Sequence, residues 1–131
     1  LGLDHIALSV TEMNRSVEFY EKLGFEFHKN WKADDGSIEM TRLTMDGMFL
    51  ELFCYREKFP MPDTAKSVAT DLPVIGTKHF ALHTDNLTET AEFLITAGII
   101  DAMPEIKTGR LGRDYFFIAD PDNILVEIIS A

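Results

Sequence analysis

The chain carries an internal repeat, and this repeat constrains its possible folds more than any other feature of the sequence. The segment that begins at His79 aligns without a gap on the segment that begins at His5. The identical pairs are His5 and His79, Ala7 and Ala81, Leu8 and Leu82, Glu18 and Glu92, Phe19 and Phe93, and Gly24 and Gly98. A second alignment places residues 46–52 on residues 122–128, so that Glu51 matches Glu127. The sequence therefore indicates a tandem duplication, each copy holding one His near its start and one Glu near its end.

The first copy has the pattern of a strand, a helix and three further strands. The strands are predicted over residues 3–10, 25–31, 38–45 and 48–53. Polar residues at 11–14 suit a helix N-terminus, apolar residues at helical spacing follow, and Gly24 suits the position after the helix end. Asp46-Gly47 predicts a two-residue hairpin, because both turn positions need a positive φ.

The second copy repeats this order. Its strands are predicted over residues 79–84, 99–105, 113–119 and 124–129, with a helix over 88–97. Pro104 interrupts the second of these strands and favours an edge position for it. We therefore predict a first module over 1–53, a linker over 54–77 and a second module over 78–131, together forming one compact domain. Phe59, Met61 and Val68 in the linker are candidates for a lid.

Composition excludes several functions. The formal net charge of −10 disfavours contact with nucleic acid, because such a surface repels phosphate. No apolar run is long enough to span a membrane. The single cysteine, Cys54, cannot form an internal disulfide and is interpreted as a small buried residue, so a reducing cytoplasm is the expected location.

Each repeat contains a carboxylate that needs a partner. Glu51 lies in Met-Phe-Leu-Glu-Leu-Phe, and Glu127 in Ile-Leu-Val-Glu-Ile-Ile. Burying an unpaired carboxylate is costly, so we expect either a buried cation or a metal beside each. A lone strand histidine such as His5 is usually a satisfied polar residue. Pseudo-twofold symmetry, however, would bring His5, Glu51, His79 and Glu127 to one divalent metal ion, of which Ni, Co, Zn, Mn and Fe all accept such donors.

Other residues are candidates for substrate binding. His83 shares a strand face with His79, although a half-exposed strand-end histidine is the simpler interpretation. Arg113, beside a glycine-flanked loop, suits an anionic substrate, and a surface ion pair with Asp114 or Asp120 is equally compatible with the sequence. Aromatic residues on strands line pockets or simply fill cores, and the candidates here are Tyr55, Tyr115 and Phe117.

Motifs over nearly the whole chain resemble a known superfamily. They are Asp4-His5-Ile6-Ala7-Leu8, Ser16-Val17-Glu18-Phe19-Tyr20, Leu23-Gly24-Phe25, Gly76, His79-Phe80-Ala81-Leu82, Phe117, Asp120-Pro121-Asp122 and Glu127. In these the sequence resembles the vicinal oxygen chelate superfamily, which includes glyoxalase I, methylmalonyl-CoA epimerase, fosfomycin-resistance transferases, bleomycin-binding proteins and extradiol dioxygenases. The resemblance implies an α+β fold in which tandem βαβββ modules form a curled, half-open mixed sheet around a metal site. It also implies a homodimer that binds a small molecule.

Within the superfamily, Glu51 favours the glyoxalase I branch, which carries a Glu at that position. The resemblance then implies a lyase or isomerase in which metal-bound substrate loses a proton α to a carbonyl and an enediolate is stabilised. Glu127 is interpreted as the base and Glu51 as the acid or base on the opposite face. Bacterial glyoxalase I forms grip glutathione with Arg and Asn where this chain has Ser9 and Tyr55. Glutathione is therefore not the expected carrier.

Two alternatives remain open. An extradiol-type dioxygenase would hold Fe(II) on His5, His79 and Glu127, without Glu51 as a ligand. A metal-free, bleomycin-resistance-like binding protein would use the same fold to sequester a small molecule, but such proteins generally lose the ligand residues. The four donors can come from one chain or from two chains of a dimer.

Overall fold

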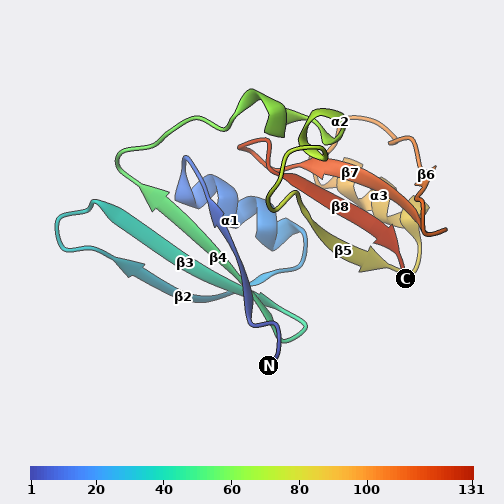
Figure 1. The fold of residues 1–131 in the computed structure, drawn as a ribbon. Helices are drawn as coiled ribbons and strands as arrows, with labels where there is room; N and C mark the ends of the chain where they lie inside the picture. The colour runs from blue at the N-terminus through green and yellow to red at the C-terminus, as the bar shows by residue number, and fades with distance from the viewer. The chain divides into compact units, whose positions relative to one another are not determined.

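The computed structural model describes residues 1–131 and divides them into two compact units, Leu1–Pro60 and Met61–Ala131. The first unit contains β1 (His5–Ser9), α1 (Met13–Lys22), β2 (Glu26–Lys32), β3 (Ile38–Met45) and β4 (Met48–Tyr55). The second unit contains η1 (Asp63–Lys66), α2 (Val68–Asp71), β5 (Phe80–Thr84), α3 (Leu87–Thr96), β6 (Lys107–Thr108), β7 (Asp114–Ala119) and β8 (Leu125–Ser130). Each unit is drawn in Figure 1 as one sheet with its own helices, so the expected α+β class is confirmed.

The two sheets have the same topology. Their strand orders are β1-β4-β3-β2 and β5-β8-β7-β6, in which β1 and β5 run parallel to their neighbours and the other pairs are antiparallel. Ala7 lies opposite Glu51 in the first unit, and Ala81 lies opposite Glu127 in the second. The sequence repeat is thus also a repeat of strand register.

The first unit buries one face of its sheet. α1 packs against β2, β3 and β4, and Leu43, Leu50 and Leu52 are at most 1% exposed. Burying a leucine side chain stabilises the fold by roughly 1.5–3 kcal/mol. Because side chains alternate along a strand, the residues between these leucines, including Glu51, project from the other face.

Glycines close the helices and the first hairpin as expected. Asp46 and Gly47 both have positive φ, 48° and 78°, which is the backbone that a two-residue hairpin needs. Gly24 and Gly98 follow α1 and α3 with φ of 102° and 70°. The carboxylate of Glu12 accepts hydrogen bonds from the first backbone N–H groups of α1. None of the helices combines the length and the apolar character that crossing a membrane requires.

The predicted strand over 99–105 is wrong. After α3 the chain folds back on the helix end, where the N–H groups of Ile99 and Ile100 donate to the carbonyl of Leu94. Pro104 offers no N–H to a neighbouring strand. Only Lys107–Thr108 pairs with β7, and the edge strand of the second sheet is therefore very short.

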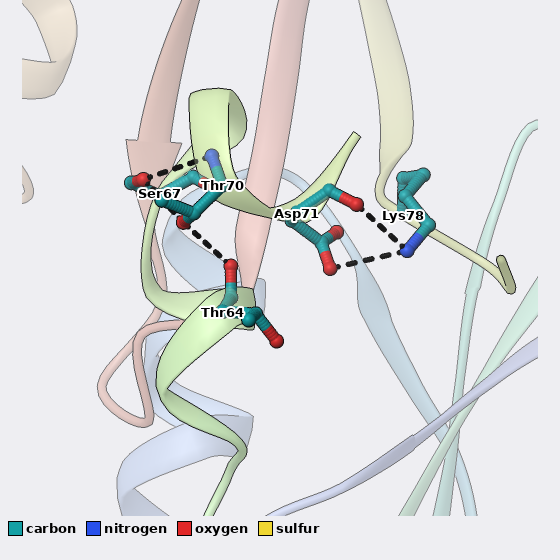
Figure 2. Close-up of polar contacts among 5 residues, drawn as sticks. All are labelled: Thr64, Ser67, Thr70, Asp71 and Lys78. Carbon is teal, nitrogen blue, oxygen red and sulfur yellow. Dashed lines mark hydrogen bonds and ion pairs between the residues drawn. The ribbon is translucent and has the colours of Figure 1, made fainter. Parts of the chain in front are cut away.

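The segment expected to be a linker is ordered by its own polar contacts (Figure 2). Thr70 donates a hydrogen bond through Oγ1 to the carbonyl of Thr64 (2.7 Å), and the Ser67 hydroxyl accepts from the Thr70 N–H at the start of α2. The Lys78 ammonium contacts both the carbonyl and the carboxylate of Asp71 at 3.1 Å. Asp71 is buried, so this ion pair ties α2 to the residue before His79.

Candidate functional site

The first unit brings its repeated His and Glu together. His5 Nε2 lies 3.5 Å from Glu51 Oε2, and the Glu51 side chain is only 7% exposed. On the other side of the ring, His5 Nδ1 lies 2.8 Å from the Asp4 carboxylate. An N–H at Nδ1 can donate to this carboxylate, and the other ring nitrogen, Nε2, faces Glu51. This arrangement is common for histidines that bind metals.

The second unit forms the equivalent pair. His79 Nε2 lies 3.3 Å from Glu127 Oε2, and both side chains are at least three-quarters buried. The His79 ring contacts the Phe117 ring edge to face, with centroids 4.9 Å apart. Phe117 lies directly opposite Glu127 in the register of β7 and β8.

Arg42 binds the glutamate of the His5–Glu51 pair. Sequence reasoning missed this residue. Its guanidinium donates to Glu51 Oε1 through Nε at 2.9 Å and also through Nη2. It lies over the Phe49 ring, 4.8 Å from the centroid, which orients the guanidinium plane. A signal was present in the sequence. The Asp46-Gly47 hairpin sets a register in which Arg42 lies opposite Glu51.

The two carboxylates therefore have different neighbours at equivalent register positions. Arg42 faces Glu51, whereas Phe117 faces Glu127. A buried cationic side chain or a metal was expected beside each glutamate, and the structure shows the cationic side chain, Arg42, at Glu51. Glu127 has the His79 ring as its neighbour, at 3.3 Å.

Within each unit, the distance between the His and Glu donor atoms is close to that of two ligands of one cation. Nitrogen and oxygen ligands about 2.1 Å from a metal lie about 3.0 Å apart at right angles and about 3.4 Å apart at the tetrahedral angle. The two Nε2–Oε2 separations, 3.5 and 3.3 Å, are close to this range. A group of three or more His, Cys, Asp or Glu side chains that could hold a metal ion is not found, so each unit by itself offers a pair of donors.

Of the expected substrate-binding residues in the second unit, Tyr115 and Phe117 line a pocket, and His83 and Arg113 are not among its lining residues. Tyr115 and Phe117 contact each other and line a pocket of about 350 Å³ in the second unit, together with Val68 from α2. His83 is exposed on the same face of β5 as Ala81, which is opposite Glu127. Arg113 donates to the carbonyl of Ser130, which is a backbone contact.

Tyr55 ends β4 in the first unit. It is 44% exposed and lies opposite Ile38, on the strand face that also carries Glu51. Tyr55 therefore lies on the same strand face as Glu51, four residues further along β4. Cys54, on the opposite face, is half-buried, and its thiol lies 3.6 Å from the carbonyl of Thr11.

Two four-stranded mixed sheets of equal topology, each with a His/Glu pair in the same register, define a duplicated α+β protein with paired metal-type donors. The chain belongs to the Glyoxalase/Bleomycin resistance protein/Dioxygenase superfamily, whose family model matches residues 2–128. The resemblance inferred from the sequence motifs is thereby confirmed.

Individual relatives agree with this assignment. The chain is 30% identical to the uncharacterized protein YwbC of Bacillus subtilis (strain 168), over 98% of this chain and 96% of the relative. A glyoxalase family protein from Enterococcus faecalis has a similar structure, with a TM-score of 0.80, 23% identity and coverage of 98% and 96% of the two chains. The trypanothione-dependent glyoxalase I of Leishmania major matches with a TM-score of 0.68, 18% identity and coverage of 99% and 86%. Both structural matches show a shared fold.

Proposed function

We propose that this protein is a metal-dependent lyase or isomerase of glyoxalase I type, which moves a proton from the carbon next to a carbonyl group of a small substrate. One divalent cation would be held by His5, Glu51, His79 and Glu127. The observation that supports this is the repeated geometry, a histidine Nε2 within 3.5 Å of a glutamate Oε2 in each unit. The Asp4 carboxylate on His5 Nδ1 adds to it.

Glu127 and Glu51 have different proposed roles, because different residues surround them. The cation, when bound, would supply Lewis acidity toward the oxygens of the substrate. Glu127 takes the proton from the substrate carbon and returns it to the neighbouring carbon, so no oxidant or reductant is consumed. Glu51 is the less mobile carboxylate, since Arg42 holds one of its oxygens. Glu51 therefore serves as a fixed charge.

The pocket beside the second pair suits the rest of the substrate. Tyr115 and Phe117 give it an aromatic wall, and Phe117 also contacts His79. Such a wall excludes water from a carbanion-like transition state. Ser9 and Tyr55 stand where glutathione-gripping residues are expected from the resemblance, so we propose a carrier other than glutathione, or none. His83 and Arg113 are proposed to contact the periphery of the substrate.

Proton exchange tests the proposed reaction. Protein loaded separately with Ni, Co, Zn, Mn or Fe(II) is incubated in D₂O with hemithioacetals made from a 2-oxoaldehyde and a panel of thiols. We expect deuterium to appear at the carbon next to the carbonyl and the Glu127→Gln variant to lose at least about a hundredfold in rate. Lys22→Gln, which removes an exposed charge of α1, is the matched control. Equal exchange by wild type and Glu127→Gln would contradict the assignment of the base.

One observation favours a second candidate, an extradiol-type dioxygenase. Because Arg42 pairs with Glu51, the donors that Arg42 does not engage are His5, His79 and Glu127, a set that suits Fe(II). Oxygen uptake by the Fe(II)-loaded protein on addition of catechols would favour this reaction. Proton exchange without oxygen uptake favours the lyase or isomerase.

We also propose that the protein acts as a homodimer in a reducing cytoplasm. Support comes from the superfamily resemblance for the dimer and from the single cysteine for the location. Light scattering during size-exclusion chromatography measures the mass, which for a dimer is twice the 14.8 kDa of the chain.

A further inference from the structure

A second pocket lies in the first unit, at the edge of the sheet that carries the His5–Glu51 pair. It has a volume of about 270 Å³ and is lined by Lys29, Asn30, Trp31, Met40 and Arg42. This volume is just below the range of about 300–1,000 Å³ that is typical of ligand pockets, so the site suits a small molecule.

The pocket lies on the same face of the sheet as Glu51. Lys29 is opposite Arg42, and Arg42 is opposite Glu51, so the three side chains form one row across β2, β3 and β4. A β-bulge between Phe27 and Lys29 produces this alignment. Without the extra residue, alternation would place Phe27 on the same face as Lys29 and Trp31.

The lining is positively charged in a chain that is strongly acidic. It includes two cations and no carboxylate, whereas the whole chain has 22 acidic and 12 basic residues. Lys32, on the other face of β2, is paired with Glu39 at 3.3 Å, but Lys29 has no acidic partner. Arg42 uses Nε and Nη2 on Glu51, and its remaining N–H groups can bind a second oxyanion.

The pocket also has a flat aromatic wall. Trp31 is 53% exposed although tryptophan is among the most hydrophobic side chains, and it lies opposite Met40. An indole face next to an ammonium and a guanidinium suits a ligand that combines a π system with a negative charge.

We infer that this pocket binds a small ligand with a flat unsaturated group on Trp31 and an oxyanion, a carboxylate or a phosphate, between Lys29 and Arg42. That such ligands are the substrate class rests on the proposed function, because the row from Lys29 to Glu51 directs the ligand toward the His5–Glu51 pair. The binding itself depends only on the pocket.

Intrinsic fluorescence tests the binding directly, because Trp31 is the only tryptophan of the chain. Metal-free protein is titrated with phenylacetate, phenyl phosphate and the uncharged phenylacetamide. We expect a saturable change with at least one anion and about tenfold weaker binding of the amide, which corresponds to about 1.4 kcal/mol. The tighter of the two anions identifies the oxyanion as carboxylate or phosphate.

Lys29→Gln and Lys32→Gln form a matched pair of variants, since both remove one positive charge from β2. We expect Lys29→Gln to weaken anion binding about tenfold and Lys32→Gln to leave it unchanged. Equal effects of the two variants, equal binding of amide and anions, or no saturable change with any probe would overturn the inference. Because no metal is present, failure of the metal-dependent reaction leaves this result unaffected, and the reverse also holds.

Discussion

At the scale of single residues, the two copies differ most clearly beside their glutamates. Glu51 is 7% exposed and is held by Arg42, while Glu127 is 16% exposed and faces the Phe117 ring. The need of each carboxylate for a partner follows from sequence, since each is the single charge of an apolar strand. The nature of the partner does not, because it depends on which side chain the neighbouring strand places opposite. Arg42 was missed, although the register of the β3–β4 hairpin places it opposite Glu51.

Removing Arg42 should therefore expose the cost of the buried charge. We expect Arg42→Met to lower the free energy of unfolding by about 1–3 kcal/mol, a range reduced because the Arg42 side chain is one-third exposed. The double variant Arg42→Met/Glu51→Gln should recover part of the loss, since no charge is then left unpaired. Urea denaturation measures both, with Lys22→Met as a surface control expected to change by less than about 0.5 kcal/mol. A double variant as unstable as the single one would assign the loss to packing.

At the scale of elements, short-range signals predicted the hairpins and helix ends but not every strand. Asp46-Gly47 identified the β3–β4 turn, and Gly24 and Gly98 identified the helix ends, because each needs a backbone that few residues adopt. The apolar residues at 99–105 suggested a strand, yet they fold back on α3. A short apolar run does not distinguish a paired strand from a segment packed beside a helix. The order within 61–77 was also missed, because it depends on polar contacts such as Lys78–Asp71.

The hairpin glycine provides a test at this scale. A Cβ added at Gly47 would meet nothing within 4 Å, so Gly47→Ala isolates the cost of a positive φ. We expect a loss of about 1–2 kcal/mol in thermal or urea unfolding. Gly2→Ala is the control, since that glycine also has open space but no positive φ. An unchanged stability would contradict a cost of positive φ at this turn position.

At the scale of the whole molecule, the duplication predicted the repeated topology and the repeated His/Glu pairs. Ala7 opposite Glu51 and Ala81 opposite Glu127 show that register survived the divergence of the two copies. Substrate contacts were harder to predict, since aromatic residues have the same strand pattern in a core and in a pocket. Tyr115 and Phe117 line a pocket, whereas His83 is exposed on β5 and Arg113 donates to the backbone carbonyl of Ser130.

Metal stoichiometry tests whether the two pairs act together. If both bind one cation, the wild type should retain about one divalent metal per chain after dialysis. Each variant His5→Ala/Glu51→Gln and His79→Ala/Glu127→Gln should then retain almost none. Elemental analysis against protein concentration provides the ratio. Two metals in the wild type and one in each variant would mean independent sites, and no metal in any of them would favour the metal-free binding protein.

The parallel pairing of β1 with β4 also has a consequence for how the chain acquires its structure. The first strand of each unit finds its neighbour only when the last strand of that unit is available, so the pairing closes a long loop and is expected to be a slow step of folding. During synthesis on a ribosome, the amino-terminal copy is complete before the carboxy-terminal copy has emerged. His5 can therefore reach Glu51 in a nascent chain that does not yet contain Glu127.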